Sequence, residues 1–226
     1  MAESQRVACW PNAQGEFFDR AQTYSTTPGE NGWTIADTSA AGTPTYANQD
    51  GGGVVLTLEA TSEAQNVCLY QADRLIFDID EIQSMTFFAK VSGIDAVTTL
   101  TMGLGSARNA TPDSVATNAW FRMEGSASTS NVVCETDDAT TDNDDKATGT
   151  TLSSTLKKFT IDFTKGKTDV RFYIDDTRVA TATTFDVSAA TGKMQPIFQI
   201  QKASGTGTPA VTIVAIDPIV CSKALS

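Results

Sequence analysis

The sequence contains no histidine, and this absence narrows the chemistry that the chain can perform. Histidine is the side chain most often used as a general base, and it is also a common metal ligand. Without it, no Ser/His or Cys/His catalytic pair exists. The chain also lacks a CxxC zinc spacing and the GxGxxG and Walker loops that hold phosphate groups. We therefore expect that the protein is not an enzyme and that it binds neither a metal nor a cofactor.

Cations and long apolar runs are also scarce. Lys and Arg total 16 against 27 Asp and Glu, which gives a formal net charge of −11. Nucleic-acid binding needs a basic surface, and an acidic protein is repelled by anionic lipid. No apolar run approaches the roughly 18 residues of a membrane-spanning helix. We expect neither nucleic acid nor a membrane as a partner, and the acidity indicates either simple solubility or the outward surface of an assembly.

An export signal is missing from the sequence as well. The N-terminal residues show no basic segment followed by an apolar core, so we expect no secretory signal peptide in this sequence. The chain is then either a mature form or one that is made and used in a cytoplasm. The four cysteines, Cys9, Cys68, Cys134 and Cys221, are scattered along the chain. Because disulfides are rare in proteins that are not exported, we expect free thiols, with two disulfides as the alternative.

What the chain does have is a long series of strand patterns. In KKFTIDFT (157–164), for example, Phe159, Ile161 and Phe163 alternate with polar residues, which is the period of a half-buried strand. No segment sustains a helical period, and residues 184–192 are the one weak candidate for a short helix. About a dozen short strands at this spacing predict an all-β sandwich or barrel. We expect strands within 33–38, 51–60, 66–71, 75–80, 84–91, 98–105, 120–126, 131–136, 157–164, 168–181, 193–205 and 210–220.

Two groups of acidic residues could carry chemistry. The polar stretch 137–150, predicted to be a loop, holds five aspartates that could bind calcium, but Ala147 stands where an EF-hand needs glycine. In FDIDEI (77–82), Asp78 and Asp80 share one strand face and could act as a glycosidase pair. We favour a solvated loop in the first case and exposed strand positions in the second, so no catalytic residue is assigned.

Aromatic residues offer the best candidates for binding. Trp120, Arg122 and Glu124 would share one face of a strand, where the ring could stack on a sugar and the charged groups could bind its hydroxyls. We take these three residues as the candidate sugar site.

The N-terminal segment offers a candidate protein interface. Residues 1–16 have no apolar period and are predicted to form an N-terminal arm, followed by a single domain over 17–226. Exposed aromatics in a polar segment often anchor interfaces. Val7, Trp10, Phe17 and Phe18 are therefore the candidate contacts with a neighbouring protein, although Phe17 and Phe18 could instead pack on their own domain.

The later strands include the segments DVRFYIDDTRVAT, MQPIFQIQKASG and VTIVAIDPIVCSKAL. These segments resemble the end of concanavalin-like jelly rolls, and residues 31–60 resemble the opening of the same domain. The resemblance implies a jelly-roll β-sandwich of two antiparallel sheets over roughly residues 30–220. The laminarinase-type β-glucanases share this fold, but their Glu-x-Asp-x-x-Glu strand is missing here. The resemblance therefore implies no glucanase activity.

Two short motifs stand in the later strands: QPxxQxQK (Gln195, Pro196, Gln199, Gln201, Lys202) and VxFYxD (Val170, Phe172, Tyr173, Asp175). They are similar to motifs of tailed-bacteriophage virion proteins. Such proteins are often head decoration (cement) proteins, which sit on the lattice of the major capsid protein, commonly as homotrimers. The resemblance thus implies a capsid-surface protein of the virion that is made in the host cytoplasm. A carbohydrate-binding module or a receptor-binding tail or fibre protein is the alternative.

Overall fold

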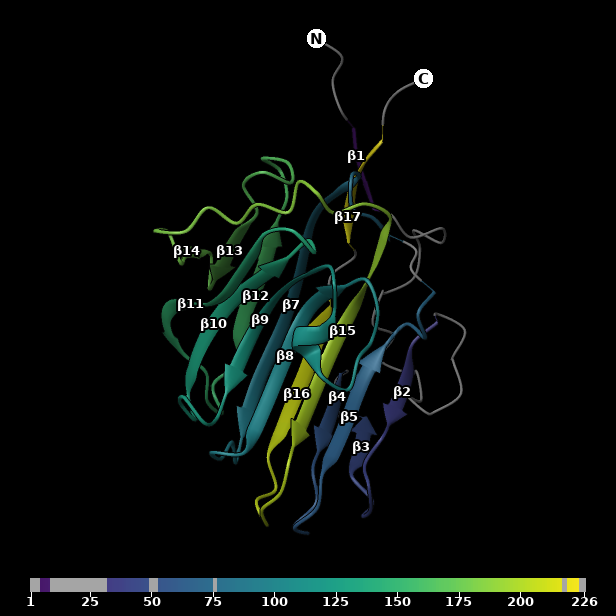
Figure 1. Ribbon diagram of the computed structural model, residues 1–226, viewed down its shortest axis with the longest axis vertical. Coiled ribbons are helices and arrows are strands. Elements are labelled where there is room, and N and C mark those ends of the chain that lie inside the picture. Colours follow the sequence, from purple (N-terminus) through teal and green to yellow (C-terminus); the bar gives the residue numbers. More distant parts are fainter. Residues whose placement is uncertain (1–4, 9–31, 49–52, 75–76, 217–218, 224–226) are drawn as a thin grey trace.

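The protein is a sandwich of two antiparallel β-sheets (Figure 1). The computed structural model describes residues 5–8, 32–48, 53–74, 77–216 and 219–223. The fold is the predicted all-β jelly roll, so this prediction is confirmed. Among the described residues, no helix has both the length and the apolar character needed to span a membrane.

Within the described residues, the two sheets contain nine and eight strands. Sheet 1 consists of β1 (Gln5–Ala8), β3 (Thr45–Asn48), β4 (Val54–Thr57), β7 (Ile82–Ser92), β12 (Lys157–Asp162), β13 (Arg171–Ile174), β14 (Thr177–Val179), β16 (Ala210–Ile216) and β17 (Val220–Lys223). Sheet 2 consists of β2 (Thr34–Asp37), β5 (Gln65–Tyr70), β6 (Phe77–Asp78), β8 (Thr98–Gly105), β9 (Asn118–Glu124), β10 (Asn131–Asp137), β11 (Asp142–Thr151) and β15 (Lys193–Lys202). A single 3-10 turn, η1 (Pro112–Ser114), lies between β8 and β9.

Strands from the end of the chain complete the centre of both sheets. The main path of sheet 1 is β14-β13-β12-β7-β16-β4-β3, and that of sheet 2 is β11-β10-β9-β8-β15-β5-β2. Strand β15 is thus inserted between β8 and β5, and β16 between β7 and β4. Because these pairings join residues far apart in sequence, neither sheet is complete until the C-terminal strands have docked.

Phenylalanines from both sheets form the centre of the core. Phe87 of β7 stacks on Phe159 of β12, with ring centroids 5.2 Å apart, and meets Phe198 of β15 edge-on at 5.1 Å. Phe121 of β9 lies edge-on to Phe159 at 4.9 Å and to Phe172 of β13 at 5.1 Å. All five rings are fully buried. Each such pair adds about 0.5–1.5 kcal/mol beyond its buried area, so the rings tie the two sheets together.

The stretch 137–150 differs from its prediction. We expected a loop, but most of it is β11, which forms a hairpin with β10. Strand β11 lies at the edge of sheet 2 and is largely exposed, so it has no apolar face that would reveal a strand. Asp138 forms the turn, because its Oδ1 accepts hydrogen bonds from the amides of Thr140 (3.0 Å) and Thr141 (2.6 Å). The weak candidate helix near 184–192 is also absent: Phe185 forms a bridge with Val170.

The cysteines differ from the expectation in part. Cys68 and Cys134 are free and buried, as predicted, and burial raises the pKa of the Cys68 thiol to about 12. Cys221 of β17, however, is disulfide-bonded, so the prediction of four free thiols is wrong. The fourth cysteine, Cys9, lies outside the described residues. Strand β1 pairs with β17 and sets Val7 opposite Cys221, so residues 5–8 of the predicted arm are part of sheet 1.

Candidate functional site

The outer face of sheet 2 is covered by the loop between β8 and β9, residues 106–117, which we name the cover loop. Figure 1 shows its turn η1 in front of β8 and β15. Beneath it the strands present polar residues that point away from the core, and most of them are buried. Burying a polar group without a hydrogen bond is costly, so these side chains need partners.

Amide side chains of β5 and β15 bind the backbone of the cover loop. Asn66 Nδ2 donates to the carbonyl of Ala110 (3.3 Å) and to Gln201 Oε1 (2.6 Å). Gln199 Nε2 donates to the carbonyl of Asn109 (3.0 Å) and to Gln201 Oε1 (2.9 Å). The three amides form one connected network, so each holds the others in a fixed orientation.

Arg108 fastens the other side of the cover loop. Its guanidinium Nη2 donates to Thr38 Oγ1 (2.6 Å) and to Asn66 Oδ1 (3.0 Å). Its backbone amide donates to Asp73 Oδ1 (3.0 Å), and Gln195 Nε2 donates to the same oxygen (2.5 Å). The loop is therefore held by β15, by the start of the β5–β6 connection and by the segment after β2.

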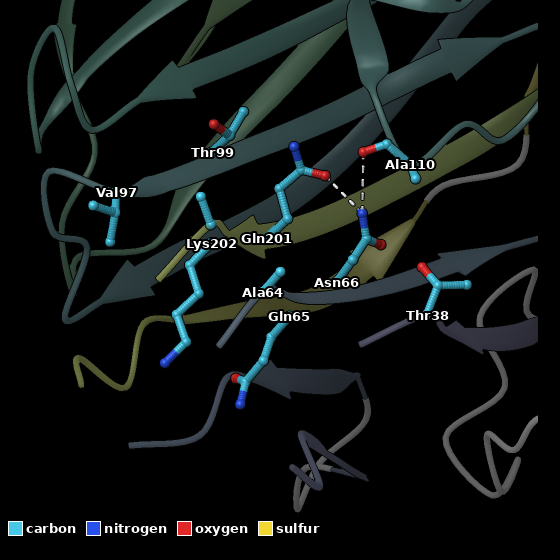
Figure 2. Close-up of a pocket in the computed structure, with 10 residues that line it drawn as sticks. Thr38, Ala64, Gln65, Asn66, Val97, Thr99, Ala110, Gln201 and Lys202 are labelled. Atoms are coloured by element: carbon cyan, nitrogen blue, oxygen red, sulfur yellow. Dashed lines mark hydrogen bonds between the residues drawn. The ribbon is translucent and has the colours of Figure 1, made fainter. Parts of the chain in front are cut away.

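A pocket of about 300 Å³ opens beside Ala110 of the cover loop (Figure 2). In Figure 2 the side chains of Asn66 and Gln201 turn toward each other beneath the carbonyl of Ala110. Polar groups and short apolar side chains share the wall. Val97, 38% exposed, is one of the two large apolar side chains that stand out on the described surface. The lining residues are Thr38, Ala64, Gln65, Asn66, Val97, Thr99, Ala110, Gln201, Lys202 and Ala203.

Lys202 is one of the lining residues, but its ammonium group is bound by backbone carbonyls of the protein. The residue is buried, and Nζ donates to the carbonyls of Gly205 (2.9 Å), Gly207 (3.1 Å) and Glu59. The ammonium group therefore has three internal acceptors, and it joins the β4–β5 and β15–β16 connections. Its charge therefore serves a structural role.

A second polar cluster surrounds Arg122 of β9. Its guanidinium binds Glu135 of β10 at 2.8 Å and also contacts Asp113 of η1 and Glu124. Arg122 and Glu135 are buried, whereas the Asp113 side chain is 57% exposed. Burial raises the pKa of Glu135 to about 7, although its hydrogen bond to Arg122 opposes this shift. Burial alone would lower the pKa of Arg122, but hydrogen bonds to Glu135 and Asp113 outweigh it and raise the pKa.

The predicted sugar site at Trp120, Arg122 and Glu124 is only partly assembled. Arg122 and Glu124 lie together as an ion pair, but Trp120 is 1% exposed. Buried residues of the cover loop, Pro112 and Val115, lie against it around a small cavity. The ring therefore has no open face for stacking, which contradicts its predicted role. The reason is tertiary: the cover loop folds back over the strand on which Trp120 lies.

The other predicted residues have local structural partners or lie outside the described part. Asp78 Oδ1 accepts the amide of Asp80 (3.1 Å), and Asp80 pairs with Lys167 (2.7 Å), so both serve a turn. Within the described residues, no group of three acidic or cysteine side chains is arranged to hold a metal ion. Val7 is in β1. Trp10, Phe17 and Phe18 lie outside the described residues.

Sequence reasoning missed the residues that line the pocket and fasten the cover loop. Asn66 and Gln201 are 135 positions apart, and only strand pairing brings them together. One signal was available: Gln195, Gln199 and Gln201 recur on a strand whose other residues, apart from a lysine at each end, are apolar. Polar residues on a central strand indicate a face that is buried by something other than the core.

Comparison with known proteins identifies the fold and no closer relationship. No family model matches the chain, and no curated protein matches it. A mucin-degrading endo-acting O-glycanase of the human gut microbiota is 8% identical, with a TM-score of 0.59 over 97% of this chain and 99% of the other. The carbohydrate recognition domain of Emp47p is 10% identical, with a TM-score of 0.56 over 88% and 92%. A Bacteroides ovatus GH16 enzyme in complex with its mixed-linkage glucan product is 9% identical, with a TM-score of 0.52 over 94% of both chains. The chain thus has the jelly-roll fold of concanavalin-like lectins and GH16 enzymes.

Proposed function

We propose that this protein is a non-catalytic carbohydrate-binding domain whose sugar site is the pocket formed by Asn66, Thr99 and Gln201. The observation that carries this proposal is the pocket itself, about 300 Å³ in volume and edged by oriented amide groups. This volume lies at the lower end of the range of small-molecule sites, about 300–1,000 Å³. The fold supports the proposal, because it is shared with a carbohydrate recognition domain and with enzymes that act on glycans.

The chemistry of the lining suits a sugar. Sugar hydroxyls donate and accept hydrogen bonds, and amide and hydroxyl side chains do the same. Val97, Ala64 and Ala203 supply apolar contact for the C–H groups of a ring. Because Gln199 and Asn66 already fix the position of Gln201 Oε1, little side-chain entropy is lost when a ligand binds.

The surroundings of the acids in the Arg122 cluster support a binding role without catalysis. Glycosidases need one carboxyl group as an acid and a second as nucleophile or base, about 5–9.5 Å apart. Here Asp113, Glu124 and Glu135 all bind the single guanidinium of Arg122. These three carboxyl groups are held by an internal partner, which leaves them unsuited to attack a glycosidic bond.

The test is a glycan array followed by titration calorimetry on two variants. Thr99→Val removes one hydroxyl without changing the shape of the side chain, and Gln201→Glu keeps the two accepted hydrogen bonds but removes the amide donor. Each should weaken binding about tenfold, the effect of one lost hydrogen bond. Thr212→Val on β16 makes the same chemical change on the other sheet and should bind as the unmodified protein does. Equal affinity of all variants, or no glycan bound at all, would refute the proposal.

A structural role in a tailed-phage virion is the second candidate. The QPxxQxQK and VxFYxD motifs favour it, and they lie on β15 and β13. In this role the protein would bind the major capsid protein as a decoration protein, as a homotrimer, or act as a receptor-binding tail or fibre protein. Strands β1 and β17 lie side by side at one end of the sandwich (Figure 1). The predicted contacts Trp10, Phe17 and Phe18 follow β1 in the sequence. Binding that is repeated over a symmetric shell would stabilise it by mass action.

Electron microscopy of shells that lack this protein tests the virion role. Addition of the purified protein should give regular density at symmetric lattice positions. The joint substitution of Trp10, Phe17 and Phe18 by serine keeps β1 intact and should abolish that density if these residues form the interface. Absence of density with the unmodified protein would exclude the decoration role and favour the receptor-binding alternative, in which the glycan array is the decisive measurement.

A further inference from the structure

The outer face of sheet 1 carries a second recess, on the opposite side of the sandwich from the pocket. This trough runs over β7, β12 and β13 and has a volume of about 420 Å³. Unlike the outer face of sheet 2, it is open, and its lining side chains are half-buried or exposed. The residues that matter for binding are Ser84, Thr86, Thr160, Thr164 and Tyr173.

Strand register places hydroxyl groups in a row across the trough. Thr86 of β7 is opposite Thr160 of β12, and Thr160 is opposite Tyr173 of β13. The hydroxyls of Thr86 and Thr160 are 2.9 Å apart and share a hydrogen bond. Tyr173 adds a phenol hydroxyl and the one aromatic ring of the trough. The row thus combines donors, acceptors and a ring within three adjacent strands, which are about 4.8 Å apart.

The charged groups at the edges of the trough already have partners. Lys158 Nζ binds Asp176 Oδ1 at 2.7 Å. Asp162 Oδ1 accepts the amide hydrogen of Thr164 at 2.8 Å. A ligand with phosphate or sulfate groups would have to displace the Lys158–Asp176 pair, and it would be repelled by a chain of net charge −11. Charge therefore favours a neutral ligand that is rich in hydroxyl groups.

We propose that this trough is a second carbohydrate site, which binds a neutral oligosaccharide laid across β7, β12 and β13. One sugar ring packs against Tyr173, and hydroxyls of the chain bind Thr160, Thr86 and Ser84. Aromatic contact and hydroxyl hydrogen bonds are the two interactions that such a ligand can use here. The trough is the larger and the more open of the two recesses, so it suits the side of an extended chain.

Two sites on opposite sheets would make the protein bivalent. One molecule could then bind two neighbouring polysaccharide chains, or two segments of one chain. Linked binding of this kind raises overall affinity for a polymer by about 10²–10⁴ over a single site. The trough does not depend on the pocket, because the two share no residue.

An NMR titration of the full chain with neutral tetrasaccharides tests the proposal. Cellotetraose, laminaritetraose, mannotetraose and xylotetraose serve as probes, and a heparin-derived tetrasaccharide serves as the anionic control. At least one neutral probe should shift the amide signals of β7, β12 and β13, and the anionic probe should not. Thr160→Val keeps the shape and strand preference of the residue and should weaken that probe about tenfold. Tyr173→Ala should weaken it further.

The outcomes separate the two sites. Thr99→Val in the pocket should leave the shifts on β7, β12 and β13 unchanged, and Thr160→Val should leave those around Asn66 unchanged. If only the pocket residues shift, the proposal of a site in the trough is wrong and that of a site in the pocket stands. If only residues of sheet 1 shift, the pocket proposal is wrong and the trough proposal stands. A probe that binds the trough equally well in the Thr160→Val and Tyr173→Ala variants, or a titration in which no neutral probe shifts sheet 1, overturns the proposal.

Discussion

Because of Glu135, the free energy of unfolding of this protein should fall as the pH rises, whereas most acidic residues have the opposite effect. Burial raises its pKa to about 7 from an ordinary value of 4.5. Between these pH values the unfolded chain releases the proton, whereas the folded protein keeps it. The contribution of protonated Glu135 to the free energy of unfolding is therefore complete below pH 4.5, and it is lost as the pH rises to about 7. At about 1.4 kcal/mol per pH unit, the loss amounts to about 3 kcal/mol.

Glu135→Gln removes this titration and preserves the hydrogen bond. The amide oxygen of the replacement can still accept the proton of Arg122 Nη1, and Asp113 and Glu124 still balance the charge of Arg122. When the pH is raised from 4.5 to 8, the free energy of unfolding of the variant should increase by about 3 kcal/mol relative to that of the unmodified protein. The absolute stability of either protein at one pH does not matter for this comparison.

Urea unfolding followed by tryptophan fluorescence, at intervals from pH 4.5 to 8, measures this difference. Cys134→Ala is the matched control, because it removes a buried neutral side chain of the same strand. The free energies of unfolding of Cys134→Ala and of the unmodified protein should differ by the same amount at every pH in this range. If the Glu135→Gln difference also stays constant, the carboxyl group is already ionised in the folded protein, and the account of the Arg122 cluster is wrong.

Four further predictions concern the parts that hold the sandwich together. Lys202→Met should lower the free energy of unfolding by about 3 kcal/mol, measured by urea titration, because it removes the donor that three partly buried carbonyls share. Phe87→Ala should cost about 3–5 kcal/mol in the same measurement by opening a cavity between the sheets. Cys221→Ser should lower the melting temperature of the oxidised protein, and a reducing agent should then lower that of the unmodified protein but not that of the variant. Asp113→Asn should loosen the cover loop, so that acrylamide quenches the fluorescence of Trp120 more strongly; unchanged quenching would show that the amide network alone holds the loop.

The strands were predictable where a strand has one buried and one exposed face. Phe159 and Ile161 of β12 are fully buried, and the polar residues between them face outward, as their alternation predicts. Strand β11 was not predicted, because this exposed edge strand has two polar faces and its residues do not alternate between apolar and polar. Alternation is a local property, and it identifies a strand only when the strand covers a core.

The candidate site was much less predictable. Trp120, Arg122 and Glu124 share the outer face of β9, as expected, but the cover loop buries the ring, and the ion pairs involve residues of the loop and of β10. The pocket next to the loop combines Asn66 of β5 with Gln201 of β15. Contacts of this kind depend on which strands become neighbours, and no short segment contains that information.

An acidic all-β chain with no histidine, in which most strands present one apolar face, can be identified without a structure. The two-residue period and the shortage of cations suffice for that step, because they are properties of neighbouring residues and of composition. Three features needed the folded molecule: β15 and β16 complete the two sheets, the cover loop closes over Trp120, and hydroxyls align as the trough on sheet 1. Those features arise from pairing between distant segments, whose energies are comparable for many alternative arrangements until the whole core has packed.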